Sequence, residues 1–349
     1  MLSFRLNGDE PRFPAEGRPV MDQEIKQWQH LALVFPGQGS QHVGMGQALA
    51  KVSKAARDIF HRADEVYGAP LSKLCWEGPE DELEKTVNQQ PASFVTSMAW
   101  LAALKERWEM LGRKFEPFLV AGHSMGEYTA AVAAGSIGFD DGLMLVRERG
   151  VLMEAAGKEQ PGGMASVLGL PQDKVEAICA EAATDGYVGL ATANCEGQNV
   201  ISGALEPLKR AMEMCDLAGA RRVVRLPITI ASHSPLMAKA SEGMSRLLQK
   251  LPLKDPQPPI VGNTGAQLIE KSGDVQTELR DQLLMGVLWQ KSVEMMRDRG
   301  ADLFIEVGPG NVLTRVIRRI DYEVNSLSIS DEYEGMLGDR LSLVEAAAL

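Results

Sequence analysis

FLVAGHSMGEYTAAV, residues 118–132, places a serine between two glycines where an apolar run meets a run with helical character. A Gly-x-Ser-x-Gly sequence in this context predicts a nucleophile elbow, a tight strand-to-helix turn with room only for small residues beside the serine. Such a turn lifts the Ser124 hydroxyl clear of the sheet. It also aims the N–H of Met125, at the positive helix end, toward an oxyanion. The alternative, a small-residue turn with an incidental serine, fits the strand-then-helix context less well.

Alternating strands and helices extend on both sides of the elbow. An apolar strand at 31–35 ends in a glycine-containing loop at 36–41, and residues 46–113 read as mostly helical with a polar break at 88–91. The elbow helix stops near Gly135. Further strands are expected at 259–262 and 302–307, and further helices at 140–156, about 275–285 and 312–320. This alternation predicts an α/β fold with a mainly parallel sheet covered on both faces.

A different pattern fills residues 162–227, where short elements follow the order β-α-β-β-α-β. The strands are expected at 164–168, 189–193, 199–202 and 222–226, and the helices at 172–183 and 205–217. This order predicts a ferredoxin-like unit inserted in the larger domain. We therefore expect a large subdomain at 30–157 and 228–330, a small one at 158–227, a poorly ordered extension at 1–29 and a tail at 331–349.

Composition narrows the function class. The chain has 349 residues, 45% hydrophobic and 24% charged, with a net charge of −11 and a pI near 5.1. An acidic globular protein is a poor match for nucleic acid or anionic membranes as partners. No apolar run reaches the roughly 18 residues of a membrane span. The four cysteines lack Cys-x-x-Cys spacing, and no signal peptide precedes them. This pattern predicts reduced thiols in a cytoplasmic enzyme without a zinc site. We also expect the protein to be a monomer.

A serine hydroxyl needs a base to become nucleophilic, and histidine is the usual base at neutral pH. Of the five histidines, His123 adjoins the serine and should point away from it. His233 lies in a loop just after the inserted unit returns to the large domain. It is the best candidate for the base.

Several motifs together resemble the malonyl-CoA:acyl carrier protein transacylase family. They keep the family's order and spacing from about residue 31 to 320. The motifs are FPGQGSQ at 35–41, QPA at 90–92, GHSMGEY at 122–128, Arg149-Gly150, Ser232-His233 and EVGPG at 306–310. The resemblance implies an α/β-hydrolase-like large subdomain and a ferredoxin-like small one.

The resemblance also implies roles for individual residues. Ser124 would be the acylated nucleophile and His233 its base, while the N–H groups of Gln38 and Met125 would form the oxyanion hole. Arg149 would bind the free carboxylate of the acyl group, a task suited to a planar guanidinium that stays charged. The alternative for Arg149 is a solvated arginine on an amphipathic helix.

In this family a main-chain carbonyl holds the histidine, so no third acidic residue is required. The resemblance assigns that carbonyl to Leu288. Met285-Gly286 and Thr192 depart from the family's pattern, and they put the rigidity of this loop and one hydrogen bond in doubt. Asn194 and Gln198 remain available to line the pocket or meet the pantetheine arm.

The implied activity moves malonyl from malonyl-CoA to the phosphopantetheine thiol of an acyl carrier protein through a malonyl-serine, with no bound cofactor or metal. The alternatives are transfer of methylmalonyl or another extender, a thioester hydrolase that clears carrier proteins, and a non-catalytic docking protein. Carrier proteins are acidic, so a chain of net charge −11 needs a local basic patch to receive one. The candidates are Arg221, Arg222, Arg225, Lys239, Arg315, Arg318 and Arg319.

Overall fold

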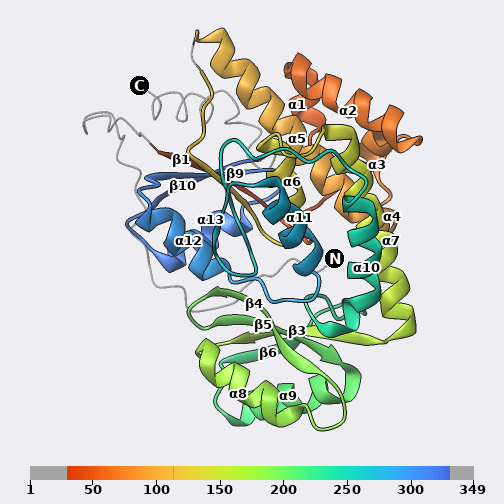
Figure 1. Cartoon of the computed structure of the whole chain (residues 1–349), viewed down its shortest axis with the longest axis vertical. Coiled ribbons are helices and arrows are strands. Elements are labelled where there is room, and N and C mark those ends of the chain that lie inside the picture. The colour runs from red at the N-terminus through yellow and green to blue at the C-terminus, as the bar shows by residue number, and fades with distance from the viewer. Residues whose placement is uncertain (1–29, 113, 331–349) are drawn as a thin grey trace.

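The larger of two sheets carries the elbow. The computed structural model describes residues 30–112 and 114–330. In these residues the six strands of this sheet lie in the order β10-β9-β1-β2-β7-β8, and Figure 1 shows β10, β9 and β1 side by side. Neighbouring strands are parallel except for β7 and β8, so the predicted mainly parallel sheet is confirmed. The strands are β1 Leu31–Phe35, β2 Leu119–Gly122, β7 Ile260–Val261, β8 Leu268–Ile269, β9 Leu303–Val307 and β10 Asn325–Ile329.

Helices cover both faces of this sheet, which is why its two central strands, β1 and β2, carry no polar side chain. The helices are α1 Gln47–Val52, α2 Lys54–Tyr67, α3 Leu71–Glu77, α4 Glu80–Leu83, α5 Thr86–Met110, α6 Gly126–Ala133, α7 Phe139–Glu159, α10 Ala238–Leu248, α11 Ser272–Asp281, α12 Trp289–Asp298, α13 Val312–Ile320 and the 3-10 turn η1 Pro235–Met237. Within the described ranges no helix is long and apolar enough to cross a membrane.

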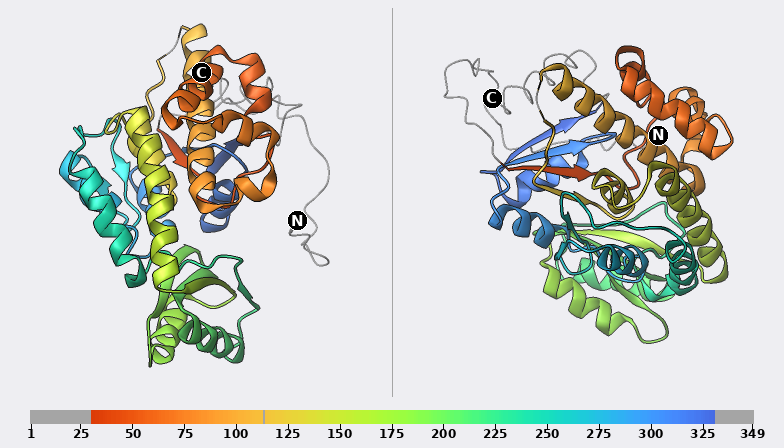
Figure 2. Two further views of the ribbon diagram at one scale, coloured as in Figure 1. Left: turned by 90° about the vertical axis from the view of Figure 1, so that its right-hand side faces the viewer. Right: turned by 45° about the horizontal axis from the view of Figure 1, so that its top comes forward.

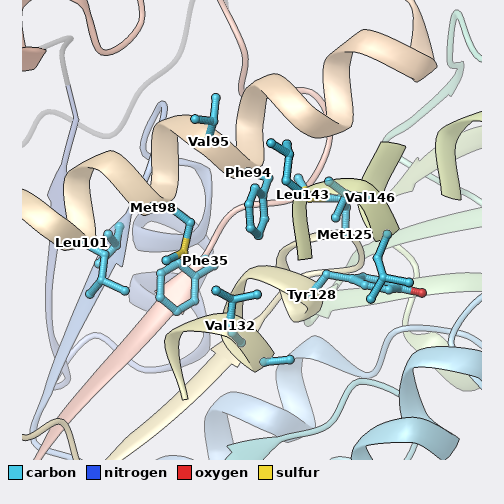
Figure 3. Close-up of a cluster of buried hydrophobic side chains, with 14 of the residues drawn as sticks. Phe35, Phe94, Val95, Met98, Leu101, Met125, Tyr128, Val132, Leu143 and Val146 are labelled. Atoms are coloured by element: carbon cyan, nitrogen blue, oxygen red, sulfur yellow. The ribbon is translucent and has the colours of Figure 1, made fainter. Parts of the chain in front are cut away.

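Alternate residues of each central strand pack into different cores. On β1, Leu33 and Phe35 join the core formed with α5, α6 and α7, whereas Ala32 and Val34 join the core formed with α12 and α13. Figure 3 shows part of the first core, where Met125 packs among side chains of α5, α6 and α7. Buried apolar packing therefore holds the elbow in place on the side that faces this core.

Two local expectations need correction. The polar break expected at 88–91 is absent, because α5 runs unbroken from Thr86 with Pro91 inside it. Pro91 lies in the second turn of α5, where its missing N–H removes one backbone hydrogen bond but does not end the helix. The helix expected at 275–285 ends at Asp281, and α10, α12, β8 and β10 were not predicted.

The predicted β-α-β-β-α-β unit is confirmed. Its elements are β3 Gly162–Leu168, α8 Gln172–Ala182, β4 Val188–Cys195, β5 Gln198–Ala204, α9 Leu205–Leu217 and β6 Arg222–Arg225. The four strands pair antiparallel in the order β4-β5-β3-β6, the ferredoxin-like arrangement. In Figures 1 and 2, α8 and α9 cover the sheet face that points away from the large part.

One backbone bridge joins the small unit to the large one close to the elbow. Val287 donates its N–H to the carbonyl of Ala191 (2.9 Å) and accepts from the N–H of Ala193 (2.9 Å), extending β4. The exact subdomain boundaries stay a prediction. The expectations for residues 1–29 and 331–349 lie outside the described residues.

Candidate active site

The Ser124 turn has the predicted elbow conformation. The φ of Ser124 is 53°, in the left-handed region. A Cβ on Gly122 would lie 2.0 Å from the Gly126 carbonyl, and a Cβ on Gly126 would lie 2.2 Å from the Phe35 carbonyl oxygen. Neither glycine can therefore carry a side chain without moving the backbone of β1, β2 or α6.

Asn263, which was not predicted as a site residue, braces this turn. It follows β7, the strand next to β2, so its side chain reaches the elbow. Its Oδ1 accepts from the Ser124 N–H (2.7 Å) and its Nδ2 donates to the Gly122 carbonyl (2.6 Å). A left-handed non-glycine residue costs about 1–3 kcal/mol. These two hydrogen bonds help to offset that cost.

Ser124 and His233 form a hydrogen-bonded pair. Ser124 Oγ lies 2.8 Å from His233 Nε2. His233 Nδ1 lies 2.7 Å from the carbonyl oxygen of Gln282 and 3.2 Å from that of Met285. Because both partners of Nδ1 are acceptors, Nδ1 carries the hydrogen and Nε2 is left to accept from the serine.

The carbonyl that orients the histidine is therefore not that of Leu288, and this expectation was wrong. The Leu288 carbonyl accepts from the N–H (3.0 Å) and the hydroxyl (3.2 Å) of Ser292 in α12. Gln282 instead caps the C-terminal end of α11, where carbonyls have no intrahelical partner. The expectation of a main-chain carbonyl in place of an acidic residue is met at a different position.

Burial sets the protonation state of His233. The side chain is almost fully buried. Burial and the positive charge of Arg149 lower the pKa of His233 to about 3. A neutral imidazole with a free Nε2 lone pair can accept the serine proton.

We expect the pH dependence of Ser124 reactivity to lack an acid limb near pH 6.5, the usual histidine pKa, because His233 stays neutral down to about pH 3 in the folded protein. The rate of Ser124 modification by a fluorophosphonate, measured from pH 5 to 8, tests this. The unfolded chain binds a proton at His233 below about pH 6.5 and the folded one does not, so acid also weakens the fold. Thermal unfolding at each pH separates the two effects, and a half-maximal rate near pH 6.5 in folded protein would contradict the expectation.

Arg149 points from α7 to the nucleophile and is only 1% exposed. It donates to the side-chain oxygens of Gln90 (2.9 Å) and Gln282 (2.8 Å), and its Nη2 lies 3.2 Å from Ser124 Oγ. The alternative of a solvated helix arginine is wrong. Burial lowers the pKa of Arg149, yet a guanidinium starts high enough to stay charged. A buried cation beside the serine can bind an anionic group of a substrate.

The two candidate oxyanion donors come from the ends of neighbouring strands. Gln38 follows β1, and Met125 follows Ser124 in the turn after β2. A Cβ on Gly37 would lie 2.6 Å from the His123 carbonyl oxygen, so this loop packs directly on the elbow. In the described part of the chain, neither N–H has an acceptor within hydrogen-bonding distance. Both donors are available to an oxyanion.

The two candidate pocket residues are already engaged with other side chains. Asn194 Oδ1 lies 2.9 Å from Nε2 of His123, whose ring packs edge-on against Trp289. Gln198 Oε1 accepts from Arg319 (2.8 Å) at the hairpin between β4 and β5. Asn194 thus lies next to the elbow through His123, whereas Gln198 contacts α13. Their contact with a substrate stays a prediction.

Gln90 and Gln282 complete the set of residues around Arg149. Gln90 belongs to the QPA motif, for which the sequence suggests no individual role, and Gln282 was not predicted as a site residue. A buried amide side chain inside or just after a helix gives no periodic signal, so only the tertiary contacts identify the pair. In the described residues no group of histidine, cysteine or acidic side chains is arranged to hold a metal ion, and the four cysteines are free and buried.

Known proteins are similar to this chain over most of its length. The family model for the acyl transferase domain matches residues 32–329. The malonyl CoA-acyl carrier protein transacylase of Bacillus subtilis is 36% identical over 302 residues, which cover 86% of this chain and 93% of that one. The solved transacylase of Coxiella burnetii has a TM-score of 0.85 at 32% identity, covering 93% of this chain and 98% of that chain. A malonyl-transacylase solved with its type II polyketide acyl carrier protein has a TM-score of 0.82 at 36% identity, covering 86% and 96%.

Proposed function

This chain belongs to the acyl transferase domain family, and we propose that it transfers malonyl from malonyl-CoA to the phosphopantetheine thiol of an acyl carrier protein. The observation that carries the proposal is a buried arginine 3.2 Å from a serine hydroxyl that is itself paired with a neutral histidine. The serine and histidine supply acyl transfer, and the cation supplies selectivity for an acyl group that ends in a carboxylate. Solved and curated relatives that bear the transacylase name support the same activity.

The first half-reaction forms a malonyl-serine ester. Ser124 Oγ attacks the thioester carbonyl while His233 Nε2 takes the hydroxyl proton. The N–H groups of Gln38 and Met125 stabilise the oxyanion of the tetrahedral intermediate. The C–S bond then breaks, and the imidazolium returns its proton to the departing CoA thiolate.

The second half-reaction repeats these steps with the carrier's thiol. His233 Nε2 takes the thiol proton, the sulfur attacks the ester carbonyl, and the same two N–H groups stabilise the oxyanion. The C–O bond breaks and the proton returns to Ser124 Oγ, which restores the enzyme. Throughout, Arg149 holds the free carboxylate by charge-assisted hydrogen bonds, which fixes the ester between attacks.

We also propose that the side chain of Met125 does not select the acyl group. It is fully buried in the core with α5, α6 and α7 (Figure 3). Only its backbone N–H faces the reaction. The proposed preference for malonyl therefore rests on Arg149, because a neutral acyl chain has no carboxylate to pair with its guanidinium. A thioester hydrolase that acts on neutral acyl chains would not require a buried cation beside the nucleophilic serine.

The basic residues expected to receive the carrier protein do not lie together: Lys239 is on α10, where it pairs with Glu159, and the six arginines divide between two places. Arg222 and Arg225 belong to β6, and Arg221 directly precedes it, at one edge of the small sheet, whereas α13, which carries the other three arginines, packs against β4 at the opposite edge. Arg318 is turned back onto β10, where it donates to the Ser326 carbonyl (2.8 Å). The seven residues therefore do not form the single patch expected from the sequence, and we propose that only one of the arginine groups receives the carrier.

The group on α13 is the better docking candidate for the carrier protein, because α13 lies next to the loop at 36–41 that carries the oxyanion donor Gln38. Gly310, just before α13, lies against Ser40, and Arg315 and Arg319 are exposed on the helix. Positive charge at this point would draw an acidic carrier toward the serine. Arg319 also contacts Gln198, the residue expected to meet the pantetheine arm.

Charge reversal at Arg315 and Arg319 together should raise the apparent KM for carrier protein about tenfold and flatten its salt dependence, since steering by charge is screened by salt. The malonyl-CoA half-reaction should be unchanged. The matched control is Arg221→Glu with Arg222→Glu at the other edge of the small sheet. If the control pair raises KM and the α13 pair does not, the docking face lies on the β6 side.

A further inference from the structure

Arg149 is a buried cation whose protein partners are all neutral. Its guanidinium contacts the amide oxygens of Gln90 and Gln282 and the hydroxyl of Ser124, and it lies over the ring of Tyr128. Its Nε has no hydrogen-bond partner in the described residues. A buried charge without a counter-ion is costly, and proteins normally pair it. The available pairing partner nearby is the acid Glu127.

Glu127 is only 1% exposed and lies next to a second buried acid, Glu278. Burial and the neighbouring Glu278 raise the pKa of Glu127 well above its usual range. Its two oxygens accept from the Asn263 N–H (2.9 Å) and from Gln282 Nε2 (2.7 Å). Among the hydrogen bonds of the described residues, none joins Glu127 to Arg149 directly, and the two residues share a partner instead.

That shared partner is the side-chain amide of Gln282. Its Oε1 accepts from Arg149 Nη2 (2.8 Å), while its Nε2 donates to Glu127 (2.7 Å) and to the Ser124 carbonyl (3.1 Å). Only one orientation of the Gln282 amide turns its oxygen toward the donor, Arg149, and its NH₂ group toward the two acceptors. The side chain is fully buried, so no water competes for these contacts.

We propose that the Gln282 side chain is a specificity-determining spacer: it separates Glu127 from Arg149, so that the guanidinium remains unneutralised and free to bind the carboxylate of the acyl group. This inference rests on the proposed function of the site. It is separate from the role of the Gln282 main chain, whose carbonyl holds His233 and survives any substitution of the side chain.

The test compares malonyl with acetyl in single-turnover acylation of Ser124. Gln282→Met removes both amide contacts at similar volume and lets Glu127 approach the cation, so the malonyl:acetyl rate ratio should fall roughly tenfold or more. Adding Glu127→Gln removes the competing acid and should restore the ratio to within about threefold of Glu127→Gln alone. Gln282→Glu puts a carboxylate directly on Arg149 and should lower the ratio by at least about 30-fold, the lower end expected when a buried charge loses its partner.

Gln90→Met is the matched control. Gln90 makes the same kind of hydrogen bond to Arg149, but its Nε2 faces Met153 Sδ (3.5 Å) rather than an acid. Its variant should therefore change the ratio less than Gln282→Met does. Thermal unfolding confirms that each variant is folded, and Gln282→Glu, which keeps length and polarity, serves if the methionine variant does not fold.

The outcomes separate the spacer from simpler roles. A ratio unchanged in both Gln282 variants, or a loss in Gln282→Met that Glu127→Gln does not rescue, would overturn the inference. In the second case Gln282 would only position Arg149. Wild-type protein that takes up no malonyl at all would overturn the proposed function itself, which the same assay reports independently.

Discussion

Arg149→Ala should lower malonyl transfer by roughly 30-fold or more while acetyl transfer holds or rises. The loss of a partner for a buried carboxylate is worth about 2–5 kcal/mol, and a neutral acyl chain has no carboxylate to lose. The measurement is kcat/KM for malonyl-CoA and acetyl-CoA with the same carrier protein. The variant also leaves the side-chain oxygens of Gln90 and Gln282 without their donor, so thermal unfolding must accompany the kinetics.

Arg147→Ala is the matched control for this prediction. Arg147 lies on the same helix, α7, but its side chain is 39% exposed and faces Glu148. Its loss should leave the malonyl:acetyl ratio unchanged. Equal losses for malonyl and acetyl in Arg149→Ala would contradict selectivity by Arg149 and assign it a structural role.

Ser124→Ala should abolish acylation and reduce transfer by at least about 10⁴-fold, because no other hydroxyl among the described residues is paired with His233 and a missing nucleophile cannot be replaced by positioning alone. An alanine at position 124 keeps the backbone of the elbow, including the N–H that donates to Asn263 Oδ1. The fold should therefore persist. Incubation with malonyl-CoA followed by intact mass reports the loss of the adduct.

Ser136→Ala controls for removal of a buried serine hydroxyl. Ser136 donates to the Lys254 carbonyl, away from the His233 pair. This variant should still be acylated. Labelling that persists in Ser124→Ala would mean that another residue carries the acyl group.

The elbow could be predicted from the sequence because its requirements are local. Only glycine fits at 122 and 126, and the apolar strand and the helix that flank them follow directly in the chain. The small unit was predictable for a similar reason, since its six elements are consecutive and alternate clearly. Where neighbours in sequence are neighbours in space, periodicity and turn residues are sufficient.

Residues brought in by tertiary structure were harder to predict. Asn263 braces Ser124 across 139 positions of sequence, and Gln282 reaches Arg149 across 133. Their positions depend on which strands become neighbours and on where α11 ends. The same uncertainty explains the misplaced carbonyl at Leu288, because α11 ends at Asp281 and directs the carbonyl of Gln282, its C-terminal cap, toward the histidine. The resemblance to a family predicted that a main-chain carbonyl holds the histidine, and the structure identifies that carbonyl as the one of Gln282.

The central claim is a malonyl-serine at Ser124 that is passed to a carrier thiol. It is tested most directly by pulse-labelling the wild-type protein with malonyl-CoA, mapping the labelled peptide, and chasing with carrier protein that has or lacks phosphopantetheine. The account predicts one malonyl group on the peptide containing Ser124, discharged quickly by the phosphopantetheinylated carrier and retained with the carrier that lacks it. A label on another residue, or equal discharge with both carriers, would contradict it.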